Sequence, residues 1–245
     1  MMNNAQISEI LTTHLELSIS PVAVSLYPNN NSKLEKYRPD KPLRSYCHGI
    51  MTAAHGQTLY LLEKDIICKS GAATLGFSNY SDEMLSGHKH YNAGVFGTIE
   101  AAKNAVTGAY KLEGGSTGAI FLRPLSQADD NYQVVLIPAN AEQIMFILVA
   151  DKYDTGGRTE ISMATGFQGI CGDVTAYSIQ TGKVNFSVTG FGDRLRCGLD
   201  PELMVISIPA GRVSIIVKNL EAMSSKMMAT YKKARDAKKR KKLKI

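Results

Sequence analysis

Four cysteines are the residues of this 245-residue sequence that could most readily do chemistry. Each lies near a glycine or a small polar residue and not inside an apolar run; they are Cys47, Cys68, Cys171 and Cys197. Four thiolates can complete a tetrahedral zinc site or hold the corners of an iron–sulfur cubane. No Cys-x-x-Cys pair is present, so the spacing does not select a metal site over its alternatives. These alternatives are cysteines that only fill the core and thiols that do redox chemistry.

Glycine-containing segments near the cysteines could bind an anion. The small residues that follow Cys68 could expose backbone N–H groups at the start of a helix. Arg194, in a glycine-rich polar segment after an apolar run, could hold a carboxylate or phosphate by bidentate contact. The alternatives are ordinary turns and an Asp–Arg pair that stitches a loop. We predict ligand-binding residues at four positions: Gly71, Gly192, Asp193 and Arg194.

Predicted helix starts affect two of the cysteines and one acid. Cys68 and Cys171 fall near such starts, where the helix dipole lowers the pKa of a thiol. Asp173 follows Cys171 by two residues, and we interpret it as an acid in the first turn of that helix.

The elements that must position these residues are a mixture of helices and strands. Apolar residues at three- and four-residue spacing predict helices, and short apolar runs bounded by turn residues predict strands. The predicted helices cover residues 7–15, 47–55, 98–106, 141–150, 172–179 and a stretch from about 213 onward. The predicted strands cover residues 22–26, 58–62, 119–122, 133–137 and 184–188, the fourth ended by Pro138. Because strands and helices do not alternate strictly, the predicted fold class is α+β, with a mixed sheet and helices.

The two halves of the chain repeat one order of features. Cys47 precedes a predicted helix, a turn, a strand and then Cys68. Cys171 precedes the same series of features and then Cys197. Two similar lobes around a pseudo-two-fold axis would therefore bring both cysteine pairs to one interface.

Two domain organisations are compatible with this repeat. Residues 1–230 form either a single globular domain or two lobes, about 1–125 and 126–230. In both cases residues 231–245 form a basic C-terminal tail.

The net charge of +6 is concentrated in that tail, which holds nine basic residues and one acid. The rest of the chain is nearly neutral, which argues against a broad nucleic-acid-binding surface on the fold. Lysine and arginine occupy every face of the tail, so we predict a solvated helix with weak nonspecific attraction to nucleic acid.

Several protein classes are excluded by missing signals. No apolar run reaches the roughly eighteen residues of a membrane span, and no charged segment precedes a short apolar stretch as in a signal peptide. We therefore expect a cytoplasmic protein with reduced cysteines. The sequence holds no Gly-x-Ser-x-Gly or His-Glu-x-x-His motif, so it selects no enzyme class.

Taken in order along the chain, a set of short motifs resembles one known family. The motifs are Pro21-Val22-Ala23-Val24, Cys47, Cys68-Lys69-Ser70-Gly71, Leu75-Gly76-Phe77, Val134-Val135, Pro138, Gly182-Lys183-Val184-Asn185-Phe186-Ser187 and Gly192-Asp193-Arg194. The series is similar to the archaeal and anaerobe-rich family called domain of unknown function 169, over roughly residues 5–222. The resemblance implies a cytoplasmic protein of strict anaerobes and a site built from glycines and cysteines, and it implies no activity.

The leading hypothesis is a cytoplasmic protein that binds a redox-active metal centre through the four cysteines. The centre would be an iron–sulfur cluster, with zinc as the alternative, and would serve electron transfer or a reductive step in anaerobic metabolism. The partner would be a redox protein or a small anionic ligand. The other hypotheses are a non-enzymatic small-molecule-binding module with structural cysteines, and nucleic-acid association through the tail.

Overall fold

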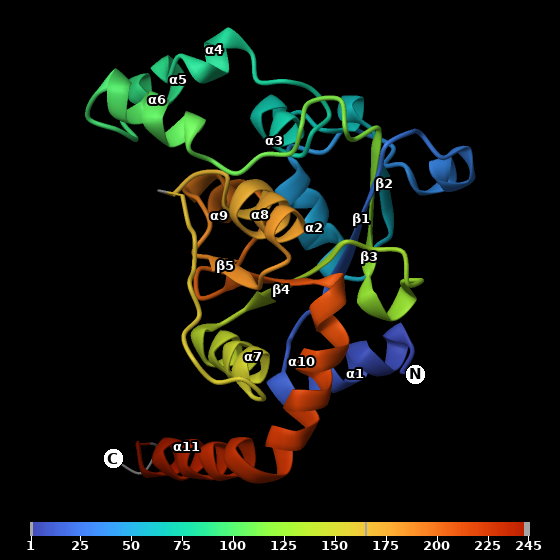
Figure 1. Ribbon diagram of the computed structural model, residues 1–245, viewed down its shortest axis with the longest axis vertical. Helices are drawn as coiled ribbons and strands as arrows, with labels where there is room; N and C mark the ends of the chain where they lie inside the picture. Colours follow the sequence, from blue (N-terminus) through green and yellow to red (C-terminus); the bar gives the residue numbers. More distant parts are fainter. Residues whose placement is uncertain (1, 165, 243–245) are drawn as a thin grey trace.

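The computed structural model describes residues 2–164 and 166–242, and it is built around one six-stranded antiparallel sheet. The strands are β1 (Val22–Tyr27), β2 (Leu59–Leu61), β3 (Ala119–Pro124), β4 (Val134–Ala139), β5 (Asn185–Ser187) and β6 (Met204–Pro209). Helices cover both of its faces, as Figure 1 shows. The predicted α+β class is confirmed.

The order of the strands is symmetric about the middle of the sheet. The order is β2-β3-β1-β4-β6-β5, so the first three strands of the chain form one half and the last three form the other. In each half the order from the edge to the middle is the same: β2, β3, β1 in the first half and β5, β6, β4 in the second. Within the sheet, the two halves are joined only where residues 22–24 of β1 pair with residues 134–136 of β4. The two halves thus share one continuous sheet.

Helices lie between most of the strands along the chain, although four of them follow one another between residues 69 and 107 and only a 3-10 turn separates β3 from β4. Those of the first half are α1 (Asn4–Leu15), α2 (Tyr46–Ala54), α3 (Lys69–Thr74), α4 (Asp82–Leu85), α5 (His88–Asn92) and α6 (Ile99–Thr107). Those of the second half are α7 (Ala141–Lys152), the π-helix η4 (Gly169–Ala176), α8 (Tyr177–Thr181), α9 (Phe191–Arg196) and α10 (Ala210–Met223). Short 3-10 turns lie at Ser32–Tyr37, Glu63–Asp65 and Leu125–Gln127. A second π-helix, Ser224–Met228, leads into α11 (Ala229–Lys242).

Alternation along the strands divides the core into two layers. Val22 and Val24 pack with α2, α3, η4 and α9 on one face, whereas Ala23 packs with α1, α7 and α10 on the other. This follows from the two-residue period of a strand, which sends successive side chains to opposite faces. The cysteine-bearing elements all lie in the first layer, so the sheet separates them from α1, α7 and α10.

Three local predictions differ from the structure. β4 continues through Pro138 to Ala139. On the side of β4 that faces β1, pairing ends at residue 136, so no β1 carbonyl needs the N–H that Pro138 lacks. The segment 169–176 is a π-helix and not the start of an α-helix. The polar-glycine segment after β5 is helix α9, begun by the Asp193 carboxylate, which accepts the Gly190 N–H at 2.9 Å.

The basic tail begins as a helix that is bound to the body of the protein. Lys232 lies 2.7 Å from Glu16, and Arg235 lies 2.5 Å from Glu142 of α7. The ring of Tyr231 packs edge-on against Phe146, with centroids 5.4 Å apart. Beyond these contacts α11 extends away from the sheet at the end of the molecule farthest from α3 (Figure 1). No helix within the described ranges is long and apolar enough to cross a membrane.

Candidate functional site: a cluster of cysteines

The four cysteines come from four separate segments of the layer above the sheet. Cys47 lies in the first turn of α2, and Cys171 lies within η4. Cys68 is the residue before α3, and Cys197 is the residue after α9. All four are free thiols; Cys47, Cys171 and Cys197 are buried, whereas Cys68 is exposed.

Cys47 is the central member of the cluster. Contacts with the thiols of Cys171 and Cys197, and then burial, raise the pKa of Cys47 well above its usual value. Cys47 therefore stays protonated, and its one S–H is available to Cys197. Residues that lie more than a hundred positions apart in the sequence thus meet at one thiol.

Cys197 is a thiol whose surroundings favour ionisation. Donation from Cys47 lowers the pKa of Cys197 below its usual value; the hydroxyl of Ser45 and the charge of Arg196 act in the same direction, and together they outweigh burial. The Ser45 hydroxyl lies 3.2 Å from the Cys197 sulfur and also accepts the N–H of His48 as the cap of α2. Because its oxygen accepts from the helix, its own hydrogen is free to point at the thiolate.

Cys68 lies at the edge of the cluster. Burial of its thiol and the proximity of Cys171 raise the pKa of Cys68, although the residue as a whole is exposed. The backbone N–H of Gly71 and the charge of Lys89 act in the opposite direction without reversing the shift. The predicted lowering of this pKa by the helix start is therefore wrong for Cys68, because desolvation is the stronger effect.

The other predicted site residues have different surroundings. Asp193 is buried, and its charge acts on Cys47, Cys68 and Cys197 as well as capping α9. Gly192 contributes its carbonyl, which lies 3.9 Å from the Cys197 sulfur.

The guanidinium of Arg194 is engaged in hydrogen bonds within the protein. Its guanidinium donates to four backbone carbonyls, those of Val188, Asp200, Pro201 and Leu203, at 2.6–3.4 Å. It therefore ties α9 to the loop that precedes β6, and its donors are engaged within the protein. No Asp193–Arg194 pair contributes to this loop, since Asp193 is directed to the cap of α9.

Backbone strain is concentrated next to the cluster. Gln168 and Thr189 adopt left-handed backbone conformations, with φ of 55° and 64°. Gly169, the first residue of η4, packs so closely that an added Cβ would lie 2.6 Å from the Cα of Thr189. Such conformations are costly for residues other than glycine and are common at functional sites, as are π-helical turns.

Three buried side-chain atoms of the residues that the structure describes lack a hydrogen-bond partner: Nδ1 of His48, Oε1 of Gln168 and Oγ1 of Thr189. His48 adjoins Cys47, and Gln168 precedes Cys171 by three residues. Buried polar groups in native proteins nearly always have a partner, so each of these atoms is an exception.

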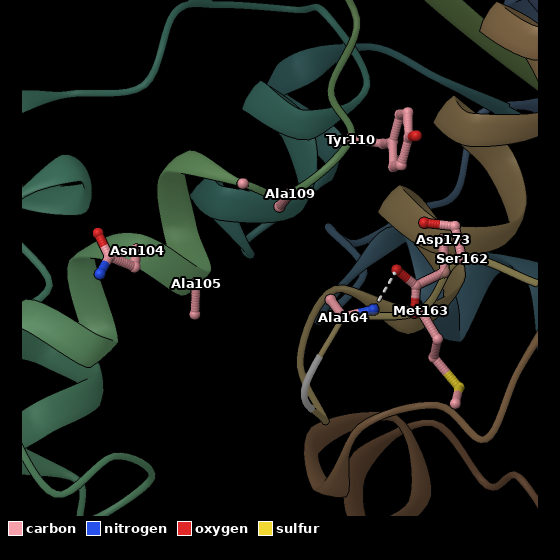
Figure 2. A pocket seen from close by; sticks show the side chains of 9 residues that line it. Asn104, Ala105, Ala109, Tyr110, Ser162, Met163, Ala164 and Asp173 are labelled. Carbon is pink, nitrogen blue, oxygen red and sulfur yellow. Dashed lines mark hydrogen bonds between the residues drawn. The ribbon is translucent and has the colours of Figure 1, made fainter.

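A cavity of about 190 Å³ lies on the other side of η4. Figure 2 shows Asn104 and Ala105 of α6 on one side of it, and Ala164 and Asp173 on the other. Asp173 accepts hydrogen bonds from the Ala164 N–H at 3.0 Å and the Ser187 hydroxyl at 2.8 Å. Burial nevertheless raises the pKa of Asp173 to about 6.

Asp173 is not the helix-start acid that we predicted. It is the fifth residue of η4 and joins that helix to β5 and to the loop that precedes Gly166. Two further residues of the site, Ser45 and Gln168, were not predicted. Ser45 stands three residues before His48 in the pattern of a helix cap, whereas no signal marked Gln168.

The thiols of the cluster touch one another but do not form a ready metal site. Within residues 2–164 and 166–242, no group of three or more His, Cys, Asp or Glu side chains is arranged to hold a metal ion. Metal binding would thus require the thiols to change rotamer and to exchange their mutual contacts for metal bonds.

Comparison with known proteins gives a family and one curated relative. The sequence profile of the DUF169 family, described as uncharacterised ArCR, matches residues 10–219. An uncharacterized protein of Methanocaldococcus jannaschii is 26% identical over 202 residues, which cover 82% of this chain and 86% of that protein. No solved structure matches the chain.

Proposed function

Because the chain belongs to the DUF169 family, described as uncharacterised, we propose a function from the site itself: binding of a redox-active metal centre by the cysteine cluster. The ligands are Cys47, Cys171 and Cys197, with Cys68 as the fourth. The convergence of these thiols from segments far apart in the sequence is the observation that carries the proposal.

The donor set fits a thiophilic centre. Thiolates favour zinc and iron–sulfur clusters over hard cations, and a cluster held by cysteines supplies one-electron transfer when bound. Hydrogen bonds from Cys47 and Ser45 lower the pKa of Cys197, which favours the thiolate form that a metal ligand requires.

The exposure of the four cysteines favours an iron–sulfur cluster over a closed structural zinc site. Cys47, Cys171 and Cys197 are buried, whereas Cys68 is exposed as a residue, although its thiol is partly desolvated. Structural zinc sites are closed, whereas a redox centre must lie near the surface to exchange electrons with a partner.

The test is the metal and acid-labile sulfide content of protein purified without oxygen, together with its visible spectrum. We expect about four iron and four sulfide per chain, with broad absorption near 400 nm. One zinc per chain without sulfide would show that the cysteines bind zinc and not an iron–sulfur cluster. A colourless, metal-free protein would overturn the proposal and favour a small-molecule-binding module.

Matched variants separate ligation from folding. Cys47→Ala and Cys171→Ala should each lose most of the metal, whereas Val174→Ala truncates a fully buried residue of the same π-helix and should retain it. Loss of metal in all three variants would indicate that the fold, and not the thiols, controls metal content.

The contact between Cys47 and Cys197 supports a second candidate, thiol–disulfide exchange. The Cys197 thiolate would attack a disulfide substrate and release one substrate thiol, and Cys47 would then release the second as the Cys47–Cys197 bond forms. The readout is the mass of the metal-free protein after treatment with oxidised glutathione. A loss of two protons in the wild type, with a stable glutathione adduct in Cys47→Ala, would support this function.

A further inference from the structure

The cavity of about 190 Å³ beside η4 has a buried carboxylate in its wall, that of Asp173. Asp173 is 3% exposed, and it takes part in none of the ion pairs formed by the residues that the structure describes. The charged group that acts on it is the Asp193 carboxylate, which is also negative. A buried charge is costly unless an opposite charge compensates it. A cation that reached Asp173 would therefore gain an interaction that the protein leaves unused.

The hydrogen bonds of Asp173 leave acceptor capacity for a ligand. Its two oxygens accept one hydrogen bond each, from the Ala164 N–H at 3.0 Å and from the Ser187 hydroxyl at 2.8 Å. An ionised carboxylate has about four acceptor positions, so further donors can bind to the same oxygens. Figure 2 shows Asp173 on the wall that faces Asn104 and Ala105 of α6 across the cavity. A ligand between these walls would thus contact the carboxylate.

The aromatic ring of Tyr110 forms another wall of the same cavity. An edge-on contact with Tyr177, with centroids 4.7 Å apart, holds this ring in place. The backbone of Tyr110 packs against η4, since a Cβ added at Gly172 would lie 3.3 Å from the Tyr110 carbonyl oxygen. Aromatic rings attract cations through their quadrupole. The cavity therefore combines a fixed ring with a fixed carboxylate, the two groups that most often bind an organic cation.

Small residues on α6 and directly after it leave the cavity open. They are Ala105, Gly108 and Ala109, while Asn104 and Ser162 contribute an amide and a hydroxyl to the lining. Asn104 and Gly108 are exposed, so a ligand can enter from solvent on this side. Sites for cofactors and drug-sized molecules measure about 300–1,000 Å³. A cavity of about 190 Å³ suits a smaller molecule.

From this arrangement we propose that the cavity binds a small organic cation, an ammonium or guanidinium compound whose N–H groups donate to Asp173 and whose carbon atoms contact Tyr110. A neutral molecule would leave the charge of Asp173 uncompensated, and an anion would be repelled by it. The ammonium of Lys111 does not fill this role, because it lies over the ring of Tyr80, 5.3 Å from its centre. The residues that line the cavity include no cysteine, so the proposal does not depend on the metal centre.

The experiment is a titration of the full-length protein with methylguanidinium at about pH 8, followed through the backbone amide signals in two-dimensional NMR spectra. Methylurea is the matched probe, because it has nearly the same shape and carries no charge. The amide of Ala164 reports on the site, since it donates to the Asp173 carboxylate. The amide of Asp40, an exposed acid, reports nonspecific attraction of the cation.

Three variants separate binding in this cavity from other effects. Asp173→Asn removes the charge and keeps the shape of the side chain. Ala105→Leu fills the cavity from α6, whereas Ala101→Leu adds the same bulk at an exposed position of that helix. A thermal melt of each variant confirms that it folds.

We expect saturable shifts of the Ala164 signal with methylguanidinium and at least about tenfold weaker binding of methylurea. Asp173→Asn and Ala105→Leu should each weaken binding of methylguanidinium by at least about tenfold, and Ala101→Leu should leave it unchanged. Equal binding of the two probes, or full binding by Asp173→Asn, would overturn the proposal. So would shifts at Asp40 and Ala164 that rise together without saturating, because they would show attraction to any carboxylate of the protein.

Discussion

The hydroxyl of Ser45 lies 3.2 Å from the sulfur of Cys197, a residue 152 positions later in the chain. Ser45 is at once the cap of α2 and a hydrogen-bond donor to a thiol whose surroundings favour ionisation. One small side chain therefore links the start of a helix in the first half of the chain to a thiol in the second half.

Replacement of Ser45 by alanine should raise the pKa of Cys197 in the metal-free protein, because the thiolate loses a donor. The midpoint of the pH dependence of Cys197 alkylation by iodoacetamide, followed by mass spectrometry, should move to higher pH. The lost cap should also lower the free energy of unfolding by about 1 kcal/mol. Ser81→Ala removes the cap of α4 without touching a thiol, so it should leave the alkylation midpoint unchanged. An unchanged midpoint in Ser45→Ala would show that Cys47 alone sets this pKa.

Replacement of Asp173 by asparagine should stabilise the metal-free protein at neutral pH. Burial raises the pKa of Asp173 from 3.8 to about 6, so the folded state binds a proton that the unfolded state releases. This contribution to stability is complete below about pH 3.8 and is lost as the pH rises through about 6. The free energy of unfolding of Asp173→Asn relative to the wild type should therefore increase by roughly 1–3 kcal/mol from pH 4 to pH 7.

Urea denaturation at several pH values measures this difference for Asp173→Asn. Asp40→Asn, which neutralises an exposed carboxylate, should show no such trend. A constant difference between Asp173→Asn and the wild type across this range would contradict the raised pKa.

Replacement of Gly169 by alanine should destabilise the fold at the strained segment beside the cluster. The added Cβ would lie 2.6 Å from the Cα of Thr189, and backbone cannot yield as a flexible side chain can. The expected loss is about 1–3 kcal/mol in the free energy of unfolding. Gly192→Ala, in α9, meets no atom within 4 Å and should be neutral or stabilising. Equal stabilities of the two variants in chemical denaturation would argue against the tight approach at Gly169.

Replacement of Glu16 by glutamine should loosen the attachment of α11. A hydrogen bond from Lys232, assisted by Arg235, lowers the pKa of Glu16 below 4.5. The ion pairs are therefore complete above that pH and are lost as the pH falls through the lowered pKa. Amide hydrogen exchange in residues 229–236 should be faster in Glu16→Gln than in the wild type at neutral pH. Glu9→Gln, on an exposed position of α1, should not change it. Identical exchange in both variants would show that the Arg235–Glu142 ion pair and the Tyr231–Phe146 contact hold the helix without Glu16.

Local sequence patterns predicted which helices and strands are present better than where each one begins and ends. Helix α1 and strand β1 were predicted correctly from the spacing of their apolar residues. The apolar residues of α1 form one buried face, and those of β1 form one buried run. Helix α9 was not predicted, because Gly190 and Gly192 resemble a loop; the informative signal was Asp193, three residues after Gly190, where an acid caps a helix. The π-helix η4 has no sequence pattern of its own, since its register depends on tertiary packing.

The cysteine cluster was predictable as a set of residues but not as a geometry. The repeated order of cysteine, helix, turn, strand and cysteine matches the symmetric order of the strands. Whether the thiols would meet, and which would ionise, depends on distances of a few ångströms between segments more than a hundred residues apart. The contacts of Arg194 could not be predicted for the same reason, because its guanidinium donates to carbonyls up to nine residues away that no side-chain pattern reveals.

The two halves of the sheet are joined only where residues 22–24 of β1 pair with residues 134–136 of β4. Because the four cysteines are divided between these halves, the cluster is complete only when both halves have folded and paired. Cys47 and Cys68 belong to the half that is synthesised first, and Cys171 and Cys197 to the half that follows. A nascent or truncated chain that ends before residue 171 holds only Cys47 and Cys68 of the four cysteines. Any property that needs all four cysteines would arise in one step, when the last strands close the sheet, and would be absent from every partly folded form.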